Sequence, residues 1–128
     1  MATFGMAFKN LNNLSADKLD KVIRGASFEL FKNIVYGTPV DSGRAKNNWI
    51  LTIDNVSDDK SDIADKTGNK AIQKASLEIN KKLGKYIYIQ NNLDYILKLE
   101  YGWSKQAPQG FVRQNILRMN QLIKKAIK

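Results

Sequence analysis

The sequence of 128 residues contains no cysteine and no histidine. Without these residues the usual nitrogen and sulfur ligands of zinc are missing, and no disulfide can form. The same absences exclude Ser-His-Asp and Cys-His nucleophilic catalysis. Carboxylates, lysine, tyrosine, serine and threonine are the side chains left for chemistry. The sequence therefore predicts a protein that is not an enzyme and that holds no cofactor and no metal.

Long apolar runs are also missing, so no segment reaches the length needed to span a membrane. The start, MATFGMAFKN, lacks the charged region and the long apolar region of a signal peptide. Both absences predict folding in a reducing cytoplasm, with export only inside an assembly. At 43% hydrophobic residues, a chain of this length is expected to build one modest core.

Positive charge is present in excess, with a net charge of +9, and it is unevenly placed. Residues 1–64 carry 8 basic and 8 acidic side chains, whereas residues 65–128 carry 13 basic and 4 acidic ones. The whole excess therefore lies in the second half. Such asymmetry indicates contact with nucleic acid or with an acidic partner subunit, although a lysine-rich surface that contacts nothing gives the same totals.

The first half begins with an expected arm and an expected long helix. Residues 1–13 are small and polar with apolar side chains at every second position (Phe4, Met6 and Phe8), a pattern of a flexible arm that can become a strand at a partner's edge. Ser15 is a favoured N-cap, Leu14 and Leu19 form a candidate hydrophobic staple, and an apolar stripe continues to Tyr36. Thr38 and Pro39 then end the helix.

Shorter elements are expected to follow. Asp41 can cap a helical turn over 44–48, residues 49–53 read as a strand, and residues 54–68 form a long acidic loop. Residues 68–82 fit a helical face and also alternate like a strand, and a strand over about 74–81 is favoured. The clearest strand covers 85–90, and Asn91 and Asn92 turn the chain.

The last part is expected to be helical. Asp94 can cap a short helix that ends at Gly102, and Pro108 precedes a final amphipathic helix. Its apolar stripe is Val112, Ile116, Met119, Ile123 and Ala126. Residues 14–128 are therefore predicted to form a single α+β domain, in which a small antiparallel sheet packs against two long amphipathic helices.

Three clusters of side chains are candidate binding sites. The carboxylates Asp54, Asp58, Asp59, Asp62 and Asp65 offer oxygen ligands for a divalent cation, but their spacing fits no EF-hand and favours a solvated loop. The segment TPVDSGR can form an anion pocket, or it can position Arg44 to pair with Glu100, which is the favoured alternative. The aromatic residues Tyr86, Tyr88, Tyr95, Tyr101 and Trp103 can stack bases, but alternating tyrosines are usually half core and half surface.

Two of these segments carry a resemblance. TPVDSGRAKNNW, followed later by YIQNNLDYILKLEYGWSKQAPQGFVRQ, closely resembles the tail-completion and neck proteins of tailed bacteriophages. The family is that of the HK97-type tail component, to which the lambda-type minor tail protein Z is also related. Its members carry T-P-V-D-[TS]-G-R before a Trp, then an element ending in E-[YF]-G, then S-x-Q-[AP]-P-x-G-[MF]-V-R. These correspond to Thr38–Arg44 with Trp49, Asn91–Gly102, and Ser104–Arg113.

The resemblance implies a structural protein of the virion. Such proteins form rings, commonly six-fold, that join the DNA-filled head to the tail and contact adjacent connector or tail-tube rings, while DNA passes through the lumen. The ring interface it implies comprises Thr38, Pro39, Asp41, Gly43, Arg44, Glu100, Gly102, Trp103, Gln106 and Pro108. Arg113, Arg118, Lys124, Lys125 and Lys128 are expected to face DNA or an acidic partner. The alternative is a small basic nucleic-acid-binding protein that uses the same C-terminal half.

Overall fold

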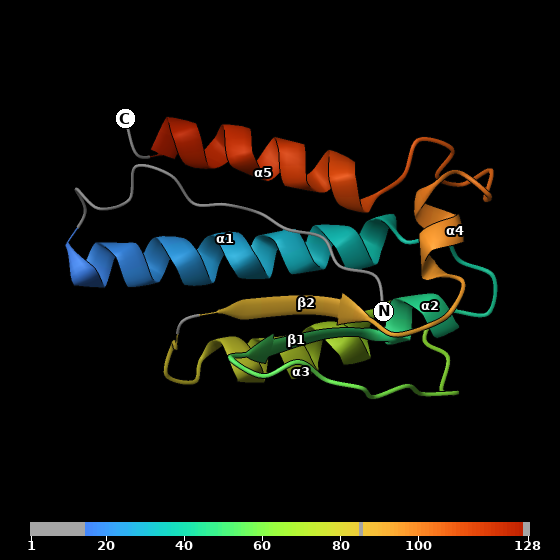
Figure 1. Ribbon diagram of the computed structural model, residues 1–128, viewed down its shortest axis with the longest axis horizontal. Helices are drawn as coiled ribbons and strands as arrows, with labels where there is room; N and C mark the ends of the chain where they lie inside the picture. Colours follow the sequence, from blue (N-terminus) through green and yellow to red (C-terminus); the bar gives the residue numbers. More distant parts are fainter. Residues whose placement is uncertain (1–14, 85, 127–128) are drawn as a thin grey trace.

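The structure is a computed structural model that describes residues 15–84 and 86–126. It contains both helices and strands (Figure 1), as the sequence predicts. In chain order these are α1 (Ala16–Gly37), α2 (Arg44–Asn47), β1 (Trp49–Ile53), α3 (Asn69–Ile79), β2 (Ile87–Asn91), α4 (Ile96–Glu100) and α5 (Val112–Ala126). The expected N-terminal arm, the staple residue Leu14, and Lys128 lie outside the described residues.

Helix α1 has the boundaries that its capping residues predict. The Ser15 side chain accepts a hydrogen bond from the Lys18 N–H and so satisfies one free donor of the first turn. At the other end Thr38 is extended, with φ −67° and ψ 128°, as expected for a residue that precedes proline. Leu30, Phe31, Ile34 and Val35 are the hydrophobic residues that the helix buries most completely.

Strands β1 and β2 form a two-stranded antiparallel sheet in which Trp49 pairs with Asn91 and Ile53 pairs with Ile87. β1 covers the predicted residues. β2 begins two residues later than predicted and includes Asn91, which is buried rather than part of a turn. The Asn91 Nδ2 group donates to the Ala45 carbonyl at 2.9 Å, and its Oδ1 accepts from the Leu93 N–H at 3.2 Å. This amide therefore fixes the end of the sheet against α2.

The prediction of a strand at 74–81 is wrong, because these residues belong largely to helix α3. Ala71, Ala75 and Ile79 are buried at helical spacing, while Leu77 is 71% exposed. The apparent alternation depended on Leu77 lying on the same side as Ala75 and Ile79, which a helix does not allow. Alanine favours a helix and is small enough to let α3 approach β1 and α1 closely, and both are neighbours of α3.

Two expected caps are also corrected. Helix α2 has Gly43 as its N-cap with no side-chain cap, and Ser42 Oγ, not Asp41, accepts the Arg44 N–H. Helix α4 starts after Tyr95, again without a side-chain cap, because Asp94 instead pairs with Lys60 at 3.3 Å. Both carboxylates stand at a suitable position in the sequence for a cap, but Asp41 is exposed to solvent and Asp94 pairs with a lysine that is distant in the sequence.

The elements form layers, with α5 packed along α1 and the sheet on the other side of α1 (Figure 1). Phe111, just before α5, packs edge-on against Trp49 of β1, with 6.3 Å between ring centroids. Arg24 of α1 donates to the carbonyls of Ile79 and Lys81 and thereby satisfies the C-terminal end of α3. Among the described helices, none has the length and apolar character that a membrane span requires.

Candidate functional site

The two segments that carry the family resemblance lie side by side in the fold. The side-chain amide of Gln106 binds the backbone of Val40 twice: Gln106 Oε1 accepts the Val40 N–H at 2.8 Å, and Gln106 Nε2 donates to the Val40 carbonyl at 2.7 Å. A pocket of about 290 Å³ lies between the segments and is lined by Pro39–Ala45, Tyr95, Leu99, Ser104 and Gln106. The site is therefore a composite of residues about sixty positions apart.

Thr38 and Trp49 hold the first segment from inside. The Thr38 hydroxyl donates to the Ile34 carbonyl at 2.7 Å and accepts the indole N–H of Trp49 at 2.8 Å. Both side chains are buried, and these bonds satisfy their polar atoms. Pro39 and Gly43 are buried as well, and a Cβ on Gly43 would lie 2.5 Å from the Lys66 nitrogen. Thr38, Pro39 and Gly43 were expected at the interface, but they are buried and support the surface residues of this segment.

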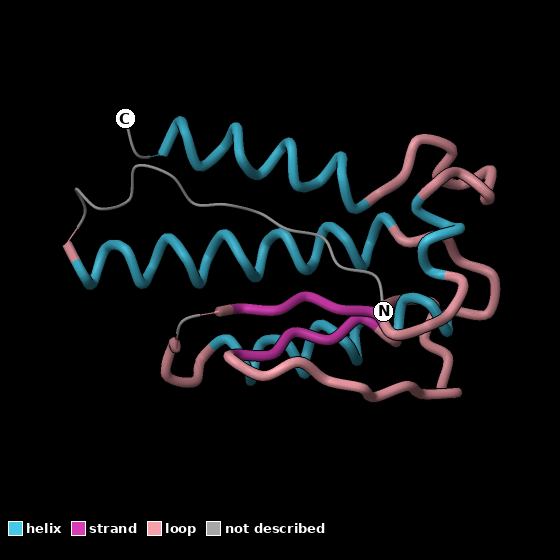
Figure 2. Tube along the Cα trace, viewed as in Figure 1, coloured by secondary structure: helices cyan, strands magenta, loops and turns pink. Residues whose placement is uncertain are grey.

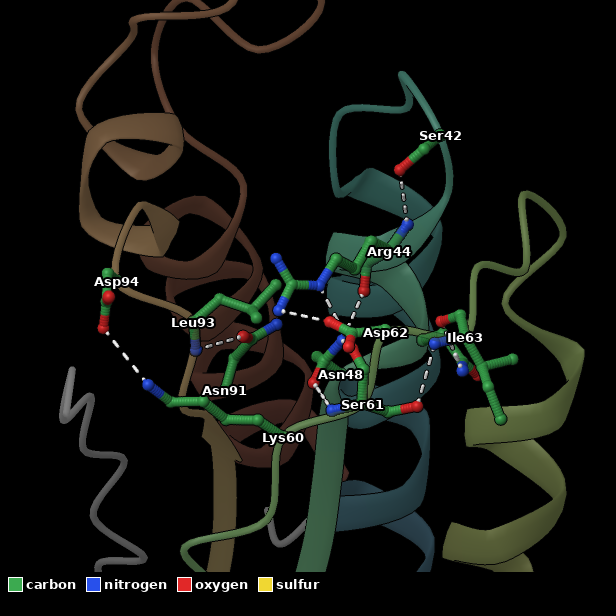
Figure 3. Close-up of polar contacts among 11 residues, drawn as sticks. Ser42, Arg44, Asn48, Lys60, Ser61, Asp62, Ile63, Asn91, Leu93 and Asp94 are labelled. Atoms are coloured by element: carbon green, nitrogen blue, oxygen red, sulfur yellow. Dashed lines mark hydrogen bonds and ion pairs between the residues drawn. The ribbon is translucent and has the colours of Figure 1, made fainter.

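The expected pairing of Arg44 with Glu100 is wrong. Arg44 lies 3.1 Å from Asp62 and donates through Nε to the Ser61 carbonyl, which ties α2 to the acidic loop (Figure 3). In the same view Asn48 binds Ser61 through both the carbonyl and the N–H of that residue. Arg44 is thus occupied by the loop that follows β1, and the anion pocket suggested for TPVDSGR loses its planar cation.

Glu100 is fully buried, with 0% of its surface exposed, and its carboxylate caps helix α5. Oε1 accepts the N–H groups of Phe111 and Val112 at 2.6 and 3.0 Å, and Oε2 accepts the Arg113 N–H at 2.8 Å. Arg113 also donates its Nε to Oε2 at 3.2 Å. A negative group at the positive end of a helix dipole is stabilising, and here it satisfies three otherwise unpaired donors. Glu100 was expected at the interface, but its role is to bind α4 to α5.

The connection from 101 to 111 bends sharply at two glycines with positive φ. Gly102 ends α4 in a Schellman motif, in which the Gly102 N–H donates to Leu99 and the Trp103 N–H donates to Lys98. Gly110, with φ 89°, passes so close to Glu100 that a Cβ would lie 2.5 Å from Oε1. The loop is consequently wound around the buried carboxylate and presents its outer side chains in a fixed arrangement.

Two large aromatic side chains project from this loop. Trp103 is 73% exposed and Tyr101 is 60% exposed, and each has a cation over its ring. Lys98 Nζ lies 4.8 Å from the Trp103 ring centroid, and the Arg113 guanidinium lies 4.4 Å from that of Tyr101. Leu97, half exposed on α4, adds apolar surface beside them. We call Leu97, Tyr101 and Trp103 the aromatic patch. Leu97 is not among the interface residues predicted from the sequence, because no local signal marks the exposure of one leucine on a short helix.

Of the remaining interface residues, Asp41, Gln106 and Pro108 are exposed and Gly102 is half buried. Of the expected basic residues, Arg118 and Lys124 are exposed on α5, whereas Arg113 is partly committed to Glu100 and Tyr101. The aromatic residues proposed for base stacking are divided: Tyr86 packs near Tyr88 at 6.1 Å between centroids, far along the chain from the aromatic patch. They form no continuous platform.

The acidic loop builds no metal site among the described residues. Its carboxylates bind protein groups: Asp62 pairs with Arg44, and Asp54 accepts the Tyr86 N–H at 3.0 Å. Asp65 accepts the Thr67 hydroxyl at 2.6 Å and the Lys70 N–H at 3.0 Å. The Thr67 hydroxyl, followed by the Lys70 N–H, lowers the pKa of Asp65 to about 2 from an ordinary 3.8. The solvated-loop interpretation accounts for these contacts, with Asp65 acting at the start of α3.

Comparison with protein-family models, with curated proteins and with solved structures finds no match to this chain. The resemblance to phage neck proteins therefore depends on the two sequence motifs alone.

Proposed function

We propose that this protein is a structural component of a tailed-phage virion that forms a ring at the head–tail junction and joins the DNA-filled head to the tail. The sheet and the two longer helices, α1 and α5, form the rigid body of each subunit. Copies of the chain, six in the ring, contact one another and the adjacent connector or tail-tube rings. The protein acts by shape and carries out no bond-making chemistry.

The observation that carries this proposal is the fixed presentation of the aromatic patch. Large aromatic side chains that are exposed in a free subunit are typical anchors of protein interfaces. Trp103 follows the Schellman turn at Gly102, and the loop beyond it is fixed through Gln106 to Val40. The patch loses little conformational entropy on binding, because its backbone is already ordered by Glu100 and these bonds.

A ring of this kind closes by heterologous contacts, in which the patch of one subunit meets a different surface of the next. The pocket between Pro39–Ala45 and Gln106 is also lined by Ser104, which follows Trp103 in the chain, and it is bordered by the exposed residues Asp41 and Ser42. The ring assembles in the host cytoplasm and is located at the neck of the virion. There the basic residues Arg118 and Lys124 face DNA in the lumen or an acidic neighbouring ring.

The test is the assembly state of a matched pair of variants. Trp103→Ala is expected to weaken subunit association by about 30-fold, because a central aromatic anchor contributes roughly 2 kcal/mol. Tyr86→Ala removes an aromatic side chain that is 61% exposed at the other end of the sheet and should leave the ring intact. Light scattering measures the mass in both. Equal association of the two variants, or a protein absent from purified virions, would contradict the proposal.

The second candidate is a nucleic-acid-binding protein, favoured by the exposed cations on α5. If the free monomer binds DNA through six or more phosphates, the logarithm of its affinity falls against the logarithm of salt with a slope of about −5 or steeper. Arg113 is already held by Glu100, whereas Arg118 and Lys124 are exposed on α5 and have no ion pair with the described residues. A shallow slope together with ring formation favours the neck protein.

A further inference from the structure

A groove of about 650 Å³ runs along strand β1 and has no role in the function proposed above. One wall is helix α3, with Lys74 and Leu77, and it continues past the end of the helix to Lys81. The other wall is the loop after β1, with Ser57 and Ser61, which runs back past the sheet (Figure 2). Strand β1 itself supplies the floor.

The floor is the free edge of β1. The Asp54 N–H donates to the Tyr86 carbonyl at 2.8 Å, so in an antiparallel pair the backbone groups of Ile50 and Thr52 also face β2. The backbone groups of the alternate residues, Trp49, Leu51 and Ile53, consequently face away from β2. In the described part of the chain, no hydrogen bond from another element reaches these outward groups.

An open strand edge is a site for another strand. Unpaired N–H and C=O groups along an edge form a template for pairing, and proteins usually cover such an edge or blunt it with charge. Here the floor of the groove is apolar, with Trp49, Ile50 and Leu51, and charged side chains (Asp59, Lys60, Lys74, Glu78 and Lys81) line its sides. The α3 wall also carries Leu77, the most exposed leucine of the described chain. Thr52 of the same strand has a buried hydroxyl for which the described residues provide no partner.

We propose that residues 3–8 of a neighbouring copy occupy this groove as a third strand, paired with the free edge of β1. The proposal rests on the ring assembly described above and specifies one of its contacts. Each subunit gives an N-terminal segment to the next and receives one in its own groove. This is strand addition, in which backbone hydrogen bonds supply affinity and alternate side chains supply specificity.

The sequence of that segment, TFGMAF, fits the two unlike walls. On one face of a strand it places Phe4, Met6 and Phe8, and on the other face Thr3, Gly5 and Ala7. The large apolar face suits the α3 wall with Leu77, and the small face suits the wall formed by the loop at Ser57 and Ser61. Six residues match the five of β1 in length, and the segment carries no charge.

The linker is long enough to reach another subunit. Six residues lie between Phe8 and the N-cap Ser15 in the sequence. They give seven Cα–Cα steps, and an extended chain covers about 3.3–3.6 Å per step, so the linker spans up to about 25 Å. That exceeds the width of a helix with its side chains, about 10–12 Å. Exchange of identical segments between copies is a common route to closed oligomers.

Disulfide trapping tests the contact directly, because the natural chain has no cysteine. One population of full-length protein carries Met6→Cys and a mass tag, and the other carries Leu77→Cys. After mixing and mild oxidation, the tagged heterodimer is expected to form about tenfold more than in the control, because docking raises the effective concentration of the two thiols. The matched control replaces Leu77→Cys with Leu117→Cys, a leucine that is 63% exposed on α5.

Several outcomes would overturn the inference. They are equal trapping with Leu77→Cys and Leu117→Cys, no trapping in either, and an intrachain disulfide in a chain that carries both Met6→Cys and Leu77→Cys. Light scattering on the same samples separates the two proposals. Rings without trapping at Leu77→Cys refute the arm exchange alone, whereas a monomer without trapping refutes both. Trapping without rings supports the strand exchange and counts against the ring.

A second variant leaves the folded body untouched. Of two consecutive residues in a strand, one must turn its N–H towards the partner, so Gly5→Pro/Met6→Pro removes a ladder bond in either register. Loss of the ring mass is expected for this variant, while Ala2→Pro, outside the segment, keeps it. A Gly5→Pro/Met6→Pro protein that assembles like the natural chain would refute the pairing.

Discussion

The two long connections of this protein, 54–68 and 101–111, are both irregular and polar, yet they are held in different ways. The 101–111 connection is organised around one buried group, the Glu100 carboxylate, which three backbone N–H groups and Arg113 contact. The 54–68 connection has no such centre. It is attached at separate points by Ser57 to Gln90, by Ser61 to Asn48 and by Asp62 to Arg44.

This difference predicts different responses to damage. Loss of the single buried charge of Glu100 should release most of the 101–111 connection together with the start of α5, because a partly satisfied buried network is costly. The contact of Gln106 with Val40 would remain. Loss of one contact in 54–68 should release a local stretch, because the other contacts remain. We call 54–68 the divided connection, because it is attached at several separate points. The 101–111 connection carries Tyr101 and Trp103 of the aromatic patch, and the divided connection forms a wall of the groove beside β1.

The largest effect is expected from Glu100→Ala. It removes the acceptor of three helix N–H groups and a charged partner of Arg113, so we expect a loss of about 3–5 kcal/mol in the free energy of unfolding. Glu100→Gln, which keeps one acceptor oxygen, should recover part of it. Urea unfolding measures both, with the exposed Glu29→Ala as the control, expected within about 0.5 kcal/mol. A loss below about 1 kcal/mol for Glu100→Ala would show that the carboxylate does not organise the connection.

Gly110→Ala is expected to have the next largest effect, about 2–3 kcal/mol of destabilisation. The residue has φ 89°, and the added Cβ would lie 2.5 Å from Glu100 Oε1 and 2.7 Å from its carbonyl oxygen. Gly25→Ala is a control for which we expect a change in stability of the opposite sign. Gly25 is an exposed glycine inside α1 with no atom within 4 Å of the new Cβ, so alanine should stabilise the protein by about 0.5–1 kcal/mol. Thermal unfolding of both variants gives the comparison, and equal melting temperatures would contradict it.

Sequence reasoning succeeded where neighbours in the chain decide the structure. Ser15 capping α1, Thr38 and Pro39 ending it, and Gly102 ending α4 all depend on residues within one turn. Trp49–Ile53 also formed the predicted strand. In each case the signal and its structural effect lie within about four residues.

It failed where distant residues decide. The sequence predicts an ion pair between Glu100 and Arg44, but Glu100 pairs with Arg113 in the first turn of the next helix. It also predicts Asp94 as a helix cap, but Asp94 pairs with Lys60. One signal for the burial of Glu100 was present, since it follows Ile96 at a spacing of four on the packed face of α4. The double contact of Gln106 with Val40 had no comparable signal, because only the fold brings the two segments together.

A smaller and local effect is expected from Asn48→Ala in the divided connection. The Asn48 amide makes hydrogen bonds with the Arg44 carbonyl and with both backbone groups of Ser61, at 2.8–2.9 Å. Its loss should cost about 1–2 kcal/mol. Limited proteolysis should show faster cleavage within 57–63 and no change at 101–111, whereas Asn55→Ala, on an exposed residue, should leave both unchanged. Faster cleavage at 101–111 would mean that the two connections are coupled.

The smallest effect is the pH dependence contributed by Asp65 at the other end of the divided connection. Its pKa is lowered to about 2, first by the Thr67 hydroxyl and then by the Lys70 N–H. Because the folded pKa lies below the ordinary value of 3.8, the stability from this carboxylate is fully present above about pH 4 and is lost as the pH falls towards 2. Carboxyl chemical shifts should give a midpoint near 2 for Asp65, and Asp65→Asn should flatten the acid limb of stability. The exposed Asp58→Asn serves as the control. A midpoint near 4 for Asp65 would contradict this prediction and would mean that α3 starts without help from this carboxylate.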